Sequence, residues 1–436
     1  MKLSKKVVLV CLFAILAMGM IFAKGKKDDS GKVLNIMCWN TEFQDRFNSH
    51  AADLAKKAGV EVNWIIVANQ GNAYQNALDE ALLNQANVDK DERIDLFLVE
   101  ADYSLKYANS DYTMDVYKEM GLKKSDTAQM YQYTKDIVTD ENGALKGLSW
   151  QATPAGLIYR RSMAKEILGT DDPAKVQEAL STWEKFDAVA AKAGAKGYAM
   201  IAGYDDDYRV FSDNITKAWV DKNNKIQIDD QLWKWVEQTK KYTDNGWNNK
   251  AALWSTAQFA GGMNNPPAGI KKVMCYFGPA WFINFSLKDS IDSDGDWAFC
   301  LGPQGFSWGG SWVCACAGSD NTTLVKDIMY RLTCDKQTAL NMVEQDGEFA
   351  NHEGAMKEVA AGSYKNEFLG GQNNIAYFLE SAKSINKTGK LTGYDQGCNE
   401  EFQAAFHEYF DGNLTKEEAL EAFYTAILEK YPDLKR

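Results

Sequence analysis

Short apolar runs alternate with amphipathic stretches from position 33 onward, and this alternation limits the fold more than any other feature of the sequence. Apolar runs at 33–39, 60–67 and 94–99 have the length and composition of strands. Between them, residues 42–57 and 73–86 carry apolar side chains at helical intervals and predict two helices. Strands that alternate with helices form parallel sheets through right-handed crossovers. The sequence therefore predicts an α/β fold.

The length of the chain predicts more than one folding unit. At 436 residues it exceeds the usual size of a single hydrophobic core, so we expect two lobes. Later apolar runs at 157–159, 273–277 and 297–301 predict further strands. Capping-box patterns at 181–184 and 415–418 predict the starts of two helices.

The first residues have the pattern of a secretory signal. Basic residues at 1–6 precede an apolar run at 7–23, and the sequence turns polar at Lys24. This predicts a signal peptide over 1–23, cleaved after Ala23, with an uncleaved membrane anchor as the alternative. Cys11 lies too early in the apolar run for a lipoprotein cleavage site, which disfavours a lipid anchor. We therefore expect an exported protein in the periplasm or another extracytoplasmic location.

The net charge of the chain restricts the kinds of molecule that it can bind. The formal net charge is −12, and it becomes −15 when the three lysines of the predicted signal are removed. An acidic surface repels phosphate backbones and anionic headgroups. We therefore expect no nucleic-acid partner and no membrane-surface partner.

Cysteines and histidines do not form a recognisable metal or disulfide pattern. Seven cysteines remain beyond the predicted signal, an odd number at irregular spacing, which favours buried free thiols over a disulfide framework. The three histidines do not stand at ligand spacing to a cysteine. The acidic run at 292–296 has its glycine misplaced for a calcium loop and lacks the glutamate at the twelfth position. We expect no metal and no cofactor.

Candidate binding residues follow the predicted strands. In open α/β sheets, ligands bind beyond the carboxyl ends of the strands. Trp39 and Glu42 follow the first predicted strand, and Glu100 and Asp102 follow the third. These side chains are candidates for a binding site. The alternative is that they are ordinary helix caps and turn residues.

The stretch at 302–318 sets aromatic rings among glycines. If the stretch is strand-like, Trp308 and Trp312 point to the same side, while Gly309 and Gly310 let a ligand approach the backbone. Indole faces pack against the C–H faces of sugars, and carboxylates and amides bond the hydroxyls. These residues therefore indicate a carbohydrate site. The alternative is that both rings fill a core.

Four segments carry a resemblance to a known family. Residues 143–161, 181–186, 274–281 and 410–420 are similar to the characteristic regions of the family 1 extracellular solute-binding proteins, the carbohydrate receptors of ABC importers. The resemblance runs from about Val33 to the end of the chain. It implies the two-lobe periplasmic-binding-protein fold, with a ligand cleft between the lobes and about three hinge crossings.

The resemblance also implies how the chain is divided. The N-terminal lobe would comprise 24–150 and 304–365, and the C-terminal lobe 151–303 and 366–436. The crossings would fall near 150–154, 302–308 and 362–371. The protein would be a monomer that delivers its carbohydrate to the membrane permease subunits of an ABC importer.

Several site roles come from the resemblance. Trp281 resembles the stacking tryptophan of the family, and Trp150 and Tyr159 would border the cleft. The full set of expected ligand-binding residues is Trp39, Glu42, Glu100, Asp102, Trp150, Tyr159, Trp281, Trp308, Gly309 and Trp312.

Two other functions remain open. Carboxylates beside aromatic rings also hold ammonium groups, so a polyamine or another small solute is an alternative ligand. A secreted glycoside hydrolase is a further alternative, since a pair of carboxylates could be assembled from the 60 acidic residues. The sequence contains no nucleophile elbow and no phosphate-binding loop. We therefore expect a binding protein and no enzyme.

Overall fold

The computed structural model describes residues 29–436. The signal peptide predicted at 1–23 lies outside these residues. None of the helices within residues 29–436 combines the length and the apolar character needed to cross a bilayer.

The first sheet contains the three predicted strands and one strand from much later in the chain. Its strands are β1 (Val33–Cys38), β2 (Glu61–Ile66), β3 (Ile94–Glu100) and β8 (Ser311–Ala315). They lie in the order β2-β1-β3-β8, with β1 parallel to β2 and β3, and β8 antiparallel to β3. The predicted strand and helix alternation with a parallel sheet is confirmed.

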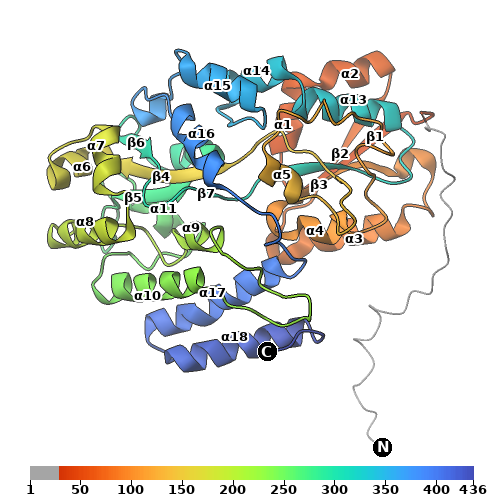
Figure 1. The fold of residues 1–436 in the computed structure, drawn as a ribbon. Coiled ribbons are helices and arrows are strands. Elements are labelled where there is room, and N and C mark those ends of the chain that lie inside the picture. Colours follow the sequence, from red (N-terminus) through yellow and green to blue (C-terminus); the bar gives the residue numbers. More distant parts are fainter. Residues whose placement is uncertain (1–28) are drawn as a thin grey trace, which may run out of the picture.

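Helices cover this first sheet. They are α1 (Glu42–His50), α2 (Ala52–Ala58), α3 (Ala73–Asn84), α4 (Ser104–Ala108), α5 (Gln132–Asp136) and α13 (Thr322–Thr333). In Figure 1, α1 and α13 lie above the sheet, and α3 and α4 lie below it. The helix predicted over 42–57 is interrupted, because the backbone of Ala51 (φ −138°) leaves the helical region between α1 and α2.

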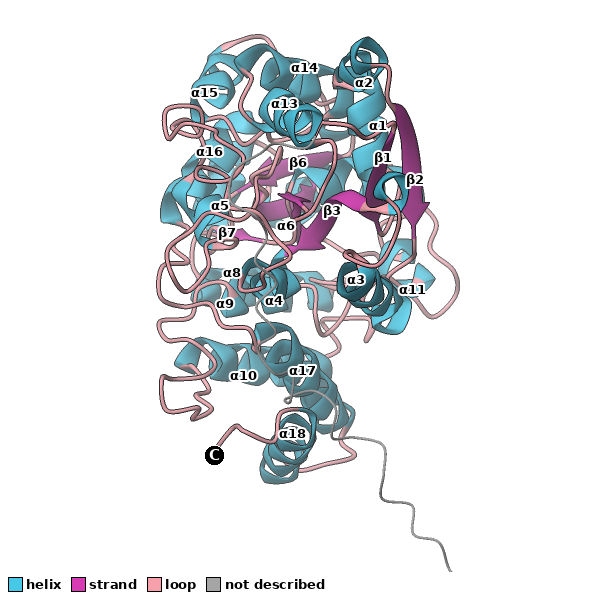
Figure 2. Cartoon of the chain, turned by 90° about the vertical axis from the view of Figure 1, so that its right-hand side faces the viewer, coloured by secondary structure: helices cyan, strands magenta, loops and turns pink. Residues whose placement is uncertain are grey.

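The second sheet is antiparallel throughout. Its strands are β4 (Pro154–Arg160), β5 (Cys275–Gly278), β6 (Trp297–Cys300) and β7 (Phe306–Ser307). The central strand β4 pairs with β5, β6 and β7. Figure 2 shows helices above and below the strands of both sheets, with β2 at the edge of the molecule.

Most of the remaining helices surround the second sheet. They are α6 (Arg161–Leu168), α7 (Pro173–Ala179), α8 (Trp183–Ala195), α9 (Tyr208–Ser212), α10 (Asp230–Asp244), α11 (Thr256–Ala260), α12 (Lys288–Ser290), α14 (Lys336–Asp346), α15 (Glu353–Ala361) and α16 (Ile375–Ser384). A π-helical turn spans Phe282–Leu287, and short 3-10 turns span Gln70–Asn72, Lys90–Glu92, Ala101–Tyr103 and Glu367–Leu369. Helix α8 begins one residue later than its sequence pattern predicts, because Thr182 is the N-cap and accepts a hydrogen bond from the Lys185 N–H.

The last two helices form a separate apolar cluster with α9 and α10. Helix α17 (Asp395–Asp411) packs on α18 (Lys416–Lys430), at the bottom of Figure 1. The capping box predicted at the start of α18 is present, with Thr415 and Glu418 bonding each other's backbone N–H. Phe402, Phe406 and Phe410 are buried in this third core.

The chain passes between the two sheets three times. Trp150 is buried in the core of the first sheet and β4 begins at Pro154, so the first crossing lies between them. The second crossing lies at 308–310, between β7 of the second sheet and β8 of the first. The third lies between α13, which packs on the first sheet, and Phe349, which is buried in the core of the second.

The packing departs from the expected lobe boundaries at two places. Because β7 pairs with β4, residues 306–307 belong with the second sheet rather than the first. Met356 and Val359 also lie in the second core, so the third crossing comes well before the expected 362–371. The glycine-rich stretch at 362–371 forms a tight turn on Trp297 of the same core, where the Phe368 ring stacks on that indole. The division into lobes at particular residues stays a prediction.

The cysteines of the described part are free thiols. Cys334 is half-buried, and the other six are buried, as the sequence predicts: Cys38, Cys275, Cys300, Cys314, Cys316 and Cys398.

Candidate functional site

A cavity of about 600 Å³ lies where the carboxyl ends of β1 and β3 face the second sheet. This volume is within the range of about 300–1,000 Å³ that small-molecule pockets have. Its walls combine residues that follow strands of the first sheet with residues from the second sheet and from the crossings. The lining residues are Trp39, Asn40, Thr41, Glu42, Asp45, Arg46, Glu100, Asp102, Gln151, Arg209, Trp254, Trp281, Phe285, Ser286, Trp308, Gly309, Gly310 and Ser311.

Most of the expected site residues meet in this cavity. Seven of the ten line it: Trp39, Glu42, Glu100, Asp102, Trp281, Trp308 and Gly309. Trp39, Glu42, Glu100 and Asp102 come together because parallel strands place their carboxyl ends at one edge of a sheet. Trp281 comes from the segment after β5, and Trp308 and Gly309 come from the second crossing. That these side chains bind a ligand stays a prediction.

Two carboxyl groups of the cavity have strongly raised pKa values. Burial raises the pKa of Glu42 to about 8, and the nearby charge of Glu348 adds to the shift. Burial also raises the pKa of Glu100 to about 8, with a further contribution from Asp102. Glu42 Oε1 accepts a hydrogen bond from Gln151 Nε2 at 3.3 Å, and Glu100 Oε2 accepts one from the Asp102 N–H at 2.8 Å.

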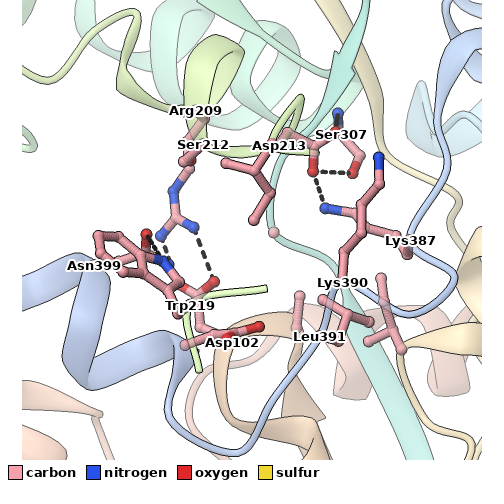
Figure 3. A pocket seen from close by; sticks show the side chains of 15 residues that line it. Asp102, Arg209, Ser212, Asp213, Trp219, Ser307, Lys387, Lys390, Leu391 and Asn399 are labelled. Carbon is pink, nitrogen blue, oxygen red and sulfur yellow. Dashed lines mark hydrogen bonds and ion pairs between the residues drawn. The ribbon is translucent and has the colours of Figure 1, made fainter. Parts of the chain in front are cut away.

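The third carboxylate forms an ion pair that joins the two sheets. Arg209 of α9 donates from its two terminal nitrogens to the two oxygens of Asp102, at 2.8 and 2.5 Å (Figure 3). Asp102 follows β3 of the first sheet, whereas α9 packs beside the second. The bidentate geometry makes this one of the stronger polar contacts between the two halves of the molecule.

A smaller cavity of about 60 Å³ lies beside the first one and shares Asp102, Arg209 and Gly309 with it. Figure 3 shows two of its ion pairs, Asp102 with Arg209 and Asp213 with Lys387. Lys387 contacts Asp213, which also accepts hydrogen bonds from the backbone N–H and the hydroxyl of Ser307. Its volume is enough for bound water but far below that of the larger cavity.

Aromatic rings form one wall of the large cavity. The centroid of Trp308 lies 5.1 Å from that of Trp281, and Trp281 Nε1 donates to the Trp308 carbonyl at 3.2 Å. Trp254 lies against both, with centroids 5.3 Å from Trp308 and 6.0 Å from Trp281. Trp308 is only 8% exposed, whereas Trp254 is 52% exposed, so the wall is deepest at Trp308 and open at Trp254.

Three expected site residues lie elsewhere, and their assignment to the cleft is corrected. Trp150, Tyr159 and Trp312 are at most 1% exposed, and none of them lines the cavity. The Tyr159 hydroxyl donates to the Asp171 carbonyl at 2.9 Å, and Trp312 Nε1 donates to a backbone carbonyl at 2.8 Å inside the first core. Tyr159 and Trp312 are therefore core residues with satisfied polar groups, and Trp150 is a buried residue of the first core.

The error for Trp312 has a geometric cause. The prediction placed Trp308 and Trp312 on one continuous strand, where they would point to the same side. Gly309 (φ 63°) and Gly310 (φ 110°) instead adopt conformations that favour glycine and turn the chain between β7 and β8. The two indoles consequently point into different regions of the molecule.

Several lining residues were not predicted from the sequence. No motif or periodicity distinguished them, because each comes from a segment whose distance to the strand ends depends on tertiary packing. They include Arg46, Gln151, Arg209, Trp254 and Phe285. Within residues 29–436, no three or more His, Cys, Asp or Glu side chains lie close enough together to hold a metal ion.

Comparisons with solved structures identify the fold. A crystal structure of an extracellular solute-binding protein of family 1 has a TM-score of 0.75 and 16% identity, over 91% of this chain and 99% of that one. The ABC transporter associated binding protein from B. animalis subsp. lactis Bl-04, in complex with beta-1,6-galactobiose, has a TM-score of 0.70 and 17% identity, over 93% and 99%. The sugar-binding protein MalE from Xanthomonas citri has a TM-score of 0.69 and 15% identity, over 92% and 98%. The predicted two-lobe fold is confirmed.

The family follows from the sequence itself. No curated protein matches this chain. The family model described as bacterial extracellular solute-binding protein matches residues 49–364. Because this match covers more than half of the chain, the protein belongs to the bacterial extracellular solute-binding family.

Proposed function

We propose that this protein is an extracytoplasmic receptor that binds a carbohydrate in the 600 Å³ cleft and delivers it to the permease of an ABC importer. The observation that carries the proposal is the composition of the cleft. Trp254, Trp281 and Trp308 cluster in one wall, and Trp39 lies with the carboxyl, amide and guanidinium groups that line the rest of the cleft. This pairing suits a sugar, whose C–H faces are apolar and whose hydroxyls surround the ring.

The roles of the residues follow from their positions. Trp281 and Trp39 offer partly exposed indoles for stacking, and the Trp308 ring packs edge-on against Trp281. Glu42, Glu100 and the ion-paired Asp102 accept hydrogen bonds from hydroxyl groups.

Structures of similar fold support the sugar assignment. The protein from B. animalis subsp. lactis holds beta-1,6-galactobiose. The GacH receptor of Streptomyces glaucescens, with a TM-score of 0.66 and 13% identity, was solved in complex with acarbose. The aromatic and polar groups that line the cleft of this chain suit the same class of ligand.

Closure about the crossings is the mechanism that this architecture favours. The crossing segments lie side by side: the Trp308 N–H donates to the Thr153 carbonyl at 3.3 Å, and the Asn351 N–H donates to the Trp150 carbonyl at 2.8 Å. A ligand that contacts both lobes stabilises the closed form relative to the open one. The closed, loaded monomer then docks to the permease, and no covalent chemistry takes place.

A cationic ligand is the second candidate. Asp102 has Arg209 as its partner, but Glu42 bonds an amide and Glu100 bonds a backbone N–H. The pKa of both carboxyl groups is raised to about 8, and an ammonium group beside them would lower it, so that they ionise and hold the cation through charge and cation–π attraction.

Thermal unfolding against a panel of ligands tests the proposal. Mono- and oligosaccharides form the panel, with polyamines and amino acids as controls. A ligand at 100 times its dissociation constant stabilises the folded protein by about 2.7 kcal/mol. A rise in melting temperature with one class of sugar supports the carbohydrate receptor. A rise with polyamines alone favours the cationic ligand instead. Release of reducing sugar over time would contradict binding without chemistry.

A further inference from the structure

Trp254 has an unusual backbone for so large a residue. Its φ of 65° lies in the left-handed region, which bulky side chains rarely adopt. Such conformations cost free energy and persist where the surrounding structure holds them, often at ligand sites. The residue stands in the loop directly before α11, and its side chain is 52% exposed.

A chain of hydrogen bonds holds this conformation. The Trp254 N–H donates to Gln258 Oε1 at 2.7 Å, and Gln258 Nε2 donates to Asp206 Oδ1 at 2.8 Å. Gln258 and Asp206 are buried, at 1% and 6% exposure. A buried amide and a buried carboxyl thus fix the backbone of an exposed indole.

The indole itself is also held in place. It is inclined at 32° to both Trp281 and Trp308, and its edge meets Phe282 at a centroid distance of 6.1 Å. These contacts cover one part of the ring and leave about half of the side chain exposed at the lining of the cleft. An ordered aromatic surface that is exposed inside a cavity is well suited to bind a ligand.

We propose that Trp254 is the outer aromatic wall of the cleft and contacts a second sugar unit, so that the ligand is at least a disaccharide. This inference rests on the proposed carbohydrate function. One pyranose ring covers about one indole face, and Trp281 supplies the face for the first unit. Because Trp254 is tilted against Trp281 rather than continuing its plane, it can pack on a neighbouring unit of the same ligand.

Titration calorimetry on Trp254→Ala, Trp254→Phe and the unchanged protein tests the inference. The probes are galactose, β-1,6-galactobiose, glucose, maltose and maltotriose. Tyr330→Ala is the control, because it removes a 42% exposed ring from α13 outside the cleft. Melting curves establish that each variant is folded.

We expect Trp254→Ala to weaken binding of the preferred disaccharide about tenfold and to change monosaccharide affinity by less than about twofold. Trp254→Phe should retain most of the affinity, and Tyr330→Ala all of it. An equal loss for both sugar sizes, or no loss at all, would overturn the role of Trp254 while leaving the receptor function standing. If the unchanged protein binds only monosaccharides, the inference also fails. If it binds no sugar, the proposed function itself fails, and the inference with it.

Discussion

Replacing Arg46 by methionine should destabilise the protein by about 3–5 kcal/mol, the usual cost of removing one partner from a buried ion pair. Arg46 donates to Glu348 Oε1 from Nε at 3.2 Å and from Nη2 at 2.9 Å. Its Nη1 also lies 3.2 Å from Asp346 Oδ1. The side chains of Arg46 and Glu348 are only 5% and 1% exposed, so solvent screens the pair little. Methionine retains much of the apolar stem but leaves the buried carboxyl group of Glu348 without its cation, whereas Asp346 keeps His50 Nε2 at 2.8 Å.

The loss should depend on pH with a definite sign. Burial raises the pKa of Glu348, and Arg46 opposes that shift. Without Arg46 the pKa rises further. A carboxyl group with a raised pKa in the folded state takes up a proton on folding. The resulting stability is present below the unfolded pKa and is lost as pH rises through the folded pKa. The deficit of the variant should therefore be smallest near pH 5 and largest at pH 8.

Urea unfolding at pH 5, 7 and 8 measures both effects, provided that the slopes of variant and parent agree. Lys57→Met is the matched control, because Lys57 pairs with Asp53 at 2.9 Å on the surface, where the side chains are 72% and 46% exposed. That pair should contribute less than about 1 kcal/mol. If Arg46→Met costs no more than Lys57→Met, or costs the same at pH 5 and pH 8, the buried-pair reasoning is refuted.

Three further perturbations test other parts of the structure. Gly309→Ala, at φ 63°, adds a methyl group 3.3 Å from an indole carbon in the cleft, and should lower ligand affinity about tenfold by calorimetry. Gly143→Ala is the control, because it imposes similar backbone strain at φ 78° but places its methyl group where no atom lies within 4 Å. Its ligand affinity should be unchanged, and an equal loss of affinity in both variants would show that steric crowding in the cleft is not the cause. The melting temperature of the unchanged protein should rise as pH falls from 8 towards 5, because burial raises the pKa of Glu42 and Glu100 to about 8. The double Glu42→Gln, Glu100→Gln variant should flatten this pH profile. An unaltered slope would show that other groups cause the pH dependence. Trp312→Phe should lower the free energy of unfolding by about 1–3 kcal/mol, since a buried carbonyl loses its donor. Ligand affinity should be retained, and a loss of affinity in the folded variant would show that Trp312 contacts the ligand.

Local patterns of the sequence determined the first sheet and the ends of several helices. The runs at 33–39, 60–67 and 94–99 match β1, β2 and β3 closely, because strand and helix periodicities are properties of neighbouring residues. The capping box at the start of α18 is likewise a local pattern. Since parallel strands align their carboxyl ends, the sequence also placed Trp39 and Glu100 at one edge of the first sheet.

Only the tertiary structure decided which aromatic rings face the cleft and which charges meet. A period of two residues shows that alternate side chains share a face, but not which face is covered, and so Trp312 was assigned to the cavity although it fills a core. Arg46 and Glu348 are 302 positions apart, and Asp102 and Arg209 are 107 apart. No motif in the sequence around Trp254 marks it as a residue of the cleft. Pairing over such separations depends on how the sheets and crossings pack together, which no local pattern specifies.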